Sequence, residues 1–213
     1  MLIGSAILLT RSRGGMIAAV VGVAALLALS FRGRRLGGLR RALIASPVLL
    51  ALVAMGVTTG GHTWTRLTDE LRIEGNDRLL ASGLALDGIA ERPWTGIGWG
   101  GYEADFRIRR TADFQIGRDQ LENDYLQQAL ELGPIPALAF LAAPALLGWI
   151  CLRGVGLRRR DQTLPALGVA TTALVATHAL VDFSLRIPAP MLLYAALMGM
   201  AVAQSFRTEE AKP

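Results

Sequence analysis

The sequence is short of several residue types, and each shortage narrows the possible chemistry. Its one cysteine, Cys151, lies in a hydrophobic run, which excludes an intrachain disulfide and a thiolate metal cluster. Lysine occurs only at Lys212, so the basic residues are otherwise arginines. His62 and His178 have no acids at metal-ligand spacing, and we therefore expect no metal and no other cofactor. The sequence has no strand-rich run and no signal peptide with a small-residue cleavage site.

Apolar residues, by contrast, make up 52% of the 213 residues, and the mean hydropathy is +0.41. A chain this apolar is typical of an integral membrane protein. Residues 1–10 are apolar but shorter than the roughly 20 residues that a bilayer requires, so we expect the end of a span whose start is missing. The sequence predicts an all-α, polytopic membrane protein with about five further transmembrane helices, at 15–31, 42–60, 135–152, 164–184 and 188–206.

The distribution of charge orients these spans. Positively charged loops stay on the cytoplasmic side, which places the arginine-rich loops 32–41 and 153–160 in the cytoplasm. The polar segment 61–133 then lies outside, and it carries thirteen acidic residues against eight arginines. We therefore expect N-terminal transmembrane helices (1–60), a long periplasmic loop, and C-terminal transmembrane helices with a short cytoplasmic tail (134–213).

Within the outer segment the apolar spacing predicts two amphipathic helices, 76–90 and 118–132. The glycine run from Gly96 to Gly101 lies between them. It lacks the preceding strand of a nucleotide-binding loop, and two interpretations stay open: a plain connector, or a loop whose backbone N–H groups at Gly98 and Gly100 approach a ligand. The apolar face predicted for the first helix consists of Leu79, Leu80, Leu84, Leu86 and Ile89.

Three arginines on the outer side are candidates for phosphate binding. Arg11 and Arg13 lie outside against the positive-inside rule, and guanidinium groups bind phosphate in a forked geometry. Arg78 on the first outer helix is the third. Membrane snorkelling and an exposed helix charge are the alternatives. A separate basic patch, at Arg107, Arg109 and Arg110, is interleaved with acids, which favours a solvated surface over a nucleic-acid site.

Two further groups of polar residues are candidates for function. His178, Asp182 and Arg186 recur every four residues and would share one face of the predicted helix 164–184. Ionisable groups in a span mark either function or a structural hydrogen-bond network. Residues Glu122 to Tyr125 open the second outer helix, where acids are ordinary partners of the helix dipole or, alternatively, supply a general base.

Four stretches together resemble the C-terminal half of the O-antigen ligase and polymerase superfamily. TRSRGG (10–15) is similar to its S-R-G-[GA] motif, and RPWTGIGWGGYEADF (92–106) to its P-x-x-G-x-G-x-G loop. ENDYLQQALELGPIP (122–136) resembles H-N-x-Y-L-x-x-L-x-E-x-G, and HALVDFSLRIPA (178–189) resembles H-x-x-x-D-F-x-L-x-x-P. Their order and spacing match, so the resemblance covers most of the chain.

The resemblance implies a multi-pass glycosyltransferase of the bacterial inner membrane, with a GT-C-like fold. It would transfer a glycan from undecaprenyl pyrophosphate to a lipid or glycan acceptor at the periplasmic face, without metal or nucleotide. The implied catalytic residues are Glu122 and Arg78, and His178, Asp182 and Arg186 would support the site. The implied pyrophosphate and glycan ligands are Arg11, Arg13, Asn123, Tyr125, Gly98 and Gly100.

The sequence departs from the family pattern in ways that keep other functions open. Glu122 stands where the family has the histidine thought to activate the acceptor, Pro136 replaces a glycine, and the number of spans is about half the usual one. A truncated or non-catalytic membrane protein that binds lipid-linked glycan is therefore the alternative. A transporter fits less well, because transport sites lie near the bilayer midplane rather than in a long outer segment.

Overall fold

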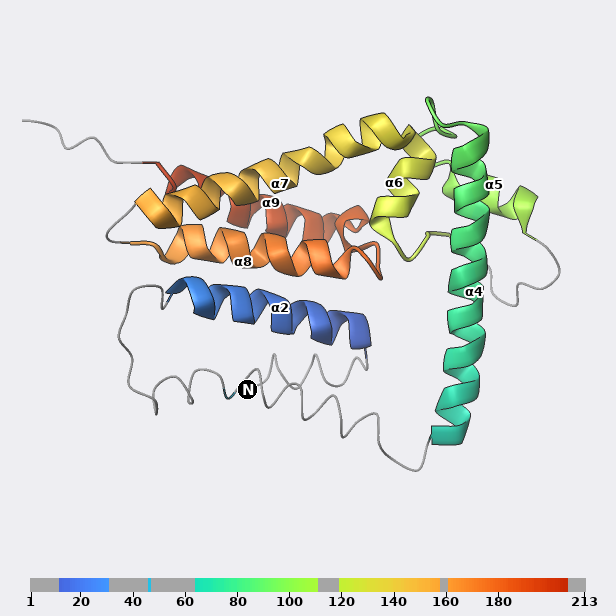
Figure 1. Ribbon diagram of the computed structural model, residues 1–213, viewed down its shortest axis with the longest axis horizontal. Helices are drawn as coiled ribbons and strands as arrows, with labels where there is room; N and C mark the ends of the chain where they lie inside the picture. Colours follow the sequence, from blue (N-terminus) through green and yellow to red (C-terminus); the bar gives the residue numbers. More distant parts are fainter. Residues whose placement is uncertain (1–11, 31–45, 47–63, 111–118, 158–160, 207–213) are drawn as a thin grey trace, which may run out of the picture. The chain divides into compact units, whose positions relative to one another are not determined.

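The computed structural model describes residues 12–30, 46, 64–110, 119–157 and 161–206, and their regular elements are all helical (Figure 1). The prediction of an all-α chain is confirmed for these residues. The elements are α2 (Arg13–Ser30), α4 (Trp64–Glu91), α5 (Tyr102–Arg109), α6 (Asp124–Leu132), α7 (Pro134–Leu157), α8 (Thr163–His178), the 3₁₀ turn η1 (Ser184–Arg186) and α9 (Pro188–Ala203).

The chain forms two compact units. The first, here called the bundle unit, comprises residues 1–58, 144–178 and 184–213, and it holds α2, most of α7, α8, η1 and α9. The second, the loop unit, comprises residues 59–143 and 179–183, and it holds α4, α5, α6 and the first turns of α7.

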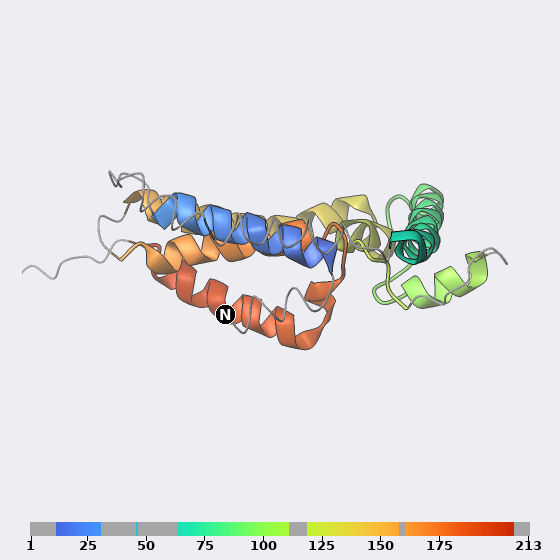
Figure 2. The same cartoon turned by 90° about the horizontal axis from the view of Figure 1, so that it is seen from below.

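Small residues bring the helices of the bundle unit close together. Helix α2 lies alongside α8 in both views (Figures 1 and 2), where a Cβ at Gly22 would come within 2.9 Å of Leu174. Gly168 of α8 likewise faces Cys151 of α7, which is 0% exposed, and Ala201 of α9. Close contact of helix backbones through small residues is typical of packing within membranes, where lipid tails are as apolar as leucine.

Among the described residues, α7 is the one helix both long and apolar enough to cross a membrane, while the apolar helices Gly14–Ser30 and Pro188–Ala203 are shorter. The predicted span 42–60 lies almost wholly outside the described residues. The span predicted at 164–184 is wrong at its end, because α8 stops at His178. Beyond it, Asp182 Oδ1 accepts the N–H of Phe183 at 2.7 Å, a local bond that competes with helix continuation.

The loop unit has its own apolar core, to which α4, α5 and α6 contribute. Its buried members are Ala81, Ala85, Tyr102, Phe106, Leu121 and Leu130, with Leu84, Ile89, Ile97 and Leu126 packed against them. The predicted helix 76–90 is part of the longer α4, but its predicted face is only partly correct. Leu79 and Leu86 are 75% and 56% exposed. The face that packs is built from small residues: a Cβ at Gly88 would come within 2.7 Å of Leu130 on α6.

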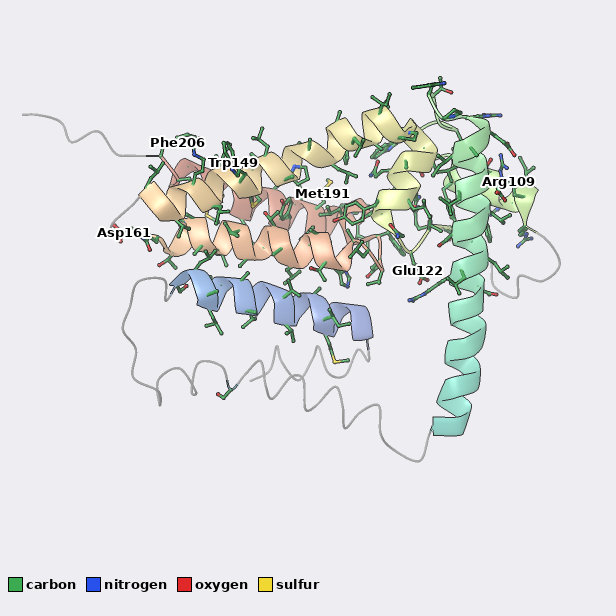
Figure 3. The ribbon with its side chains drawn as sticks, in the orientation of Figure 1. Arg109, Glu122, Trp149, Asp161, Met191 and Phe206 are labelled. Carbon is green, nitrogen blue, oxygen red and sulfur yellow. The ribbon has the colours of Figure 1, made fainter. Side chains whose placement is uncertain are left out.

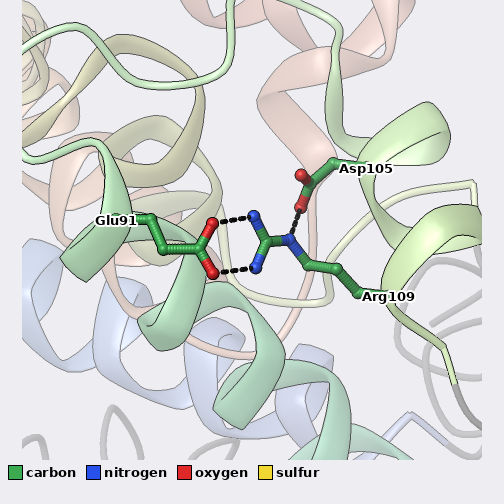
Figure 4. A network of polar contacts seen from close by, with 3 residues as sticks. All are labelled: Glu91, Asp105 and Arg109. Atoms are coloured by element: carbon green, nitrogen blue, oxygen red, sulfur yellow. Dashed lines mark hydrogen bonds and ion pairs between the residues drawn. The ribbon is translucent and has the colours of Figure 1, made fainter.

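Helix α5 was not predicted, and ion pairs hold it. Arg107 pairs with Glu103 one turn earlier, and Arg109 Nε donates to Asp105 at 2.8 Å. The two terminal nitrogens of Arg109 also reach back to Glu91 at the end of α4, at 2.8 and 2.6 Å (Figure 4). These bonds lower the pKa of Glu91. Arg107 and Arg110 are exposed, as a solvated patch requires, whereas the Arg109 side chain is largely buried and ties α5 to α4.

The small-residue face of α4 can be tested with two glycines of the same helix. Gly83→Ala places a methyl group where no other atom lies within 4 Å, so we expect the free energy of unfolding to rise by roughly 0.5–1 kcal/mol through helix propensity. Gly88→Ala pushes against buried Leu130, and we expect a net loss of about 1–3 kcal/mol from overpacking. Denaturant unfolding in detergent measures both. Equal stabilisation by the two changes would contradict this packing.

Candidate functional site

The structure brings the two predicted catalytic residues into contact. Arg78 Nε on α4 forms an ion pair with Glu122 Oε2, and the side chains are 44% and 23% exposed. Glu122 lies in the segment before α6 (Figure 3). Because both belong to the loop unit, the pair follows from the packing of α4 on α6. A carboxylate that can accept a proton therefore lies beside a permanent cation, with part of the pair open to a ligand.

The predicted helix 118–132 begins later than expected. Helix α6 starts at Asp124, and Asn123 caps it: the Asn123 Oδ1 accepts the N–H of Leu126 at 3.1 Å. Glu122 is thus a pre-helix residue rather than a first-turn acid. The side chain of Asp124 is buried, and its N–H donates to the carbonyl of Ala179 at 2.9 Å. Burial, and then the charge of Asp124, raise the pKa of Tyr125.

The glycine loop is fixed in place by α6. Ile97 and Gly98 donate their N–H groups to the carbonyls of Leu130 and Glu131, at 3.0 and 2.9 Å, and Gly100 donates to Glu131 Oε2 at 3.0 Å. The idea that the N–H groups of Gly98 and Gly100 meet a ligand is therefore wrong for this structure. Both glycines have positive φ, of 99° and 75°, and no atom lies within 4 Å of a Cβ added at either. Both positions therefore present an open, exposed face.

Glu131 and Gln127 were missed as candidates. Both are buried, with exposures of 1% and 0%. Gln127 Nε2 donates to Glu131 Oε1 at 2.9 Å and to Gln120 Oε1 at 2.7 Å, and Gln127 Oε1 accepts the N–H of Leu121 at 2.9 Å. The signal in the sequence was a polar pair four residues apart on an otherwise amphipathic helix, next to a glycine-rich loop.

Of the other predicted site residues, Arg13, His178 and Arg186 belong to the bundle unit, whereas Asp182 belongs to the loop unit. Ser12 Oγ accepts the N–H of Gly15 at 3.1 Å in the first turn of α2, and a Cβ at Gly15 would lie 3.6 Å from His178 Nε2. The other ring nitrogen of His178 is 2.8 Å from Ser184 Oγ. The N-terminus of α2, which begins at Arg13, thus meets a histidine at the end of α8. Backbone N–H groups and the helix dipole make such a terminus favourable for anions.

The predicted face of His178, Asp182 and Arg186 is wrong. Helix α8 ends at His178, Asp182 follows in irregular chain, and Arg186 closes η1. Residues four apart share a face only within one continuous helix. Arg11 lies outside the described residues, so the predicted phosphate binding by Arg11, Arg13 and Arg78 stays a prediction. In the described part of the chain, no three His, Cys, Asp or Glu side chains are placed to hold a metal ion.

A family model described as O-antigen ligase matches residues 1–142, which is two-thirds of the chain. The matched residues include three of the four resembling motifs, while the stretch 178–189 lies outside them. No curated protein matches the chain.

The contribution of the Arg78–Glu122 pair to stability shows whether it is a weak surface pair or a structural tie between α4 and the segment before α6. Because the pair is partly exposed, a double-mutant cycle of Arg78→Gln and Glu122→Gln should give a coupling free energy of only about 0.2–1 kcal/mol. Equilibrium unfolding of the two single variants, the double variant and the wild type measures it. A coupling of several kcal/mol would instead identify the pair as a structural tie.

Proposed function

Since the chain belongs to the O-antigen ligase family, we propose that it transfers a glycan from undecaprenyl pyrophosphate to a lipid or glycan acceptor at the periplasmic face of the bacterial inner membrane. The family match assigns it an O-antigen ligase or polymerase type of role, with lipid-linked glycans as the general class of substrate. Members of the family are inner-membrane proteins. Our proposal adds three points to this general role: the donor lipid is undecaprenyl pyrophosphate, the acceptor is a lipid or glycan, and transfer takes place at the periplasmic face.

The contact between Arg78 and Glu122 is the observation that carries this proposal. In the proposed reaction the acceptor hydroxyl oxygen forms a bond to the anomeric carbon of the glycan. The bond from that carbon to the pyrophosphate oxygen breaks, and the pyrophosphate leaves on its lipid. Glu122 accepts the hydroxyl proton, and Arg78 stabilises the negative charge that develops on the leaving group.

The first turn of α2 supports the pyrophosphate part of the proposal. Arg13 begins this helix, Ser12 caps it, and His178 faces it at Gly15. A diphosphate at this terminus would gain from the helix dipole and from arginine donors. Within the bundle unit we assign Arg11 and Arg13 to diphosphate binding, and within the loop unit we assign Asn123, Tyr125 and the open faces of Gly98 and Gly100 to sugar binding.

One observation favours a second function, a non-catalytic protein that binds lipid-linked glycan. Glu122 occupies the place of the family histidine, and it already pairs with the arginine that would serve the leaving group. In the second function, the Glu122 carboxylate pairs with Arg78 to shape a glycan-binding surface and takes no part in catalysis. The two functions differ in one measurable respect, because a binding protein retains donor without consuming it.

The test is transfer by purified protein in liposomes that contain a lipid-linked oligosaccharide and an acceptor. We expect Glu122→Gln to lower transfer about 100-fold or more, since the general base is lost, and Glu122→His to retain activity with an altered pH profile. The control is Glu103→Gln, an exposed α5 carboxylate that should leave transfer unchanged. Transfer unaffected by both Glu122 variants excludes it as the base, and donor binding without transfer by the wild type supports the second function.

The proposed topology has its own test. Reporter fusions after Arg110, at the end of α5, should be active only in the periplasm, because the acidic outer segment contrasts with the arginine-rich loops 32–41 and 153–160. A fusion after Leu157 is the opposite control, because the predicted basic loop 153–160 begins within α7, which ends at that residue. A cytoplasmic signal at residue 110 would exclude periplasmic transfer.

A further inference from the structure

We propose that Glu131 is a positioning residue, which acts through Gln127 to hold the glycine loop and the Glu122 segment in a fixed relation. This inference rests on the proposed function for its catalytic consequence, but its structural part stands on contacts within the loop unit.

A carboxylate as buried as Glu131 is costly unless its oxygens are hydrogen-bonded. At 1% exposure, Glu131 meets this condition with two donors: the N–H of Gly100 at 3.0 Å and the Gln127 amide at 2.9 Å. One donor belongs to the glycine loop and the other to α6 itself. The carboxylate therefore bridges the loop to the helix.

The bridge continues to the residue before Glu122. Gln127 receives the N–H of Leu121 at 2.9 Å on its carbonyl oxygen, and Leu121 is 2% exposed in the core of the unit. A continuous series of hydrogen bonds thus runs from Gly100 through Glu131 and Gln127 to Leu121. The loop and the Glu122 segment are fixed at its two ends.

The two ends of this series dictate the chemical type of each member. Both ends are backbone N–H groups, of Gly100 and Leu121, and these can only donate. Gln127 accepts from Leu121 and donates to residue 131, so residue 131 must accept on both sides. A carboxylate does this, whereas the amide of a glutamine would set a donor against a donor at one of the two contacts.

The loop keeps other attachments when Glu131 changes. The carbonyls of Leu130 and Glu131 still accept the N–H groups of Ile97 and Gly98. We therefore expect Glu131→Gln to fold, with Gly100 at one end and the Leu121–Glu122 segment at the other displaced. A catalytic group displaced by about 1 Å can lose on the order of 100-fold in rate.

The experiment exchanges the carboxylate and the amide. Glu131→Gln should lower kcat about 10- to 100-fold with a smaller change in KM. Gln127→Glu should also lower it, because two carboxylates then meet. In the double variant Glu131→Gln with Gln127→Glu, residue 127 accepts on both sides and residue 131 accepts from Gly100, which restores every contact between Gly100 and Leu121. Gln120 accepts from Gln127 in the wild type, and it keeps a contact with a carboxylate at residue 127 by turning its own NH2 group toward it. We expect kcat of the double variant to return to within a few-fold of the wild type, with Glu103→Gln as the neutral control.

Amide hydrogen exchange separates this inference from the proposed function. Peptides that contain Gly100 and Leu121 should exchange faster in both single variants and regain protection in the double variant, whether or not the protein transfers glycan. Unchanged protection in the singles, or a double variant no better than the two singles combined, overturns the positioning role. If the wild type and the double variant both protect these amides but neither transfers glycan, the positioning role stands. Only the proposed function is then overturned.

Discussion

The loop unit depends on the need of two buried polar side chains on α6, Glu131 and Gln127, for hydrogen-bond partners. The N–H groups of Gly100 and Leu121, which lie 21 residues apart in the sequence, supply two of these partners. Leaving a buried polar group without a partner costs on the order of 1–3 kcal/mol. Because this cost is avoided only when the loop and the Glu122 segment both lie against α6, the same bonds that stabilise the unit also fix its geometry.

The bundle unit is held by a different kind of contact. Its helices meet at Gly22, Gly148, Gly154 and Gly168, where an added Cβ would come within 3.0 Å of a neighbouring side chain. Packing of this kind needs no hydrophobic driving force between the helices, and it suits a protein of an inner-membrane family. It also lets α2 approach α8 closely, since a Cβ at Gly22 would come within 2.9 Å of Leu174.

The sequence predicted helices well where they consist of long apolar runs. It predicted helix ends poorly where local hydrogen bonds determine them. The apolar runs located α2, α7 and α9. The first turn of α6 was misplaced because Asn123 takes an extended backbone to cap it, and α8 was extended past His178 although Asp182 favours a local bond. The packed face of α4 was misassigned because apolar size was used as the guide, whereas the close approach of α6 selects Gly88 and two alanines.

The candidate site was only partly predictable for a related reason. The motifs identified Arg78 and Glu122 separately, but their contact depends on how α4 packs against α6. That contact has a consequence for the proposed reaction. While Arg78 is paired with Glu122, each of the two side chains is engaged by the other. In the proposed reaction, a donor pyrophosphate that draws Arg78 away would leave the Glu122 carboxylate open to the acceptor hydroxyl. Glutamate in place of histidine would then link donor binding to acceptor activation, because one contact must open for both roles to begin.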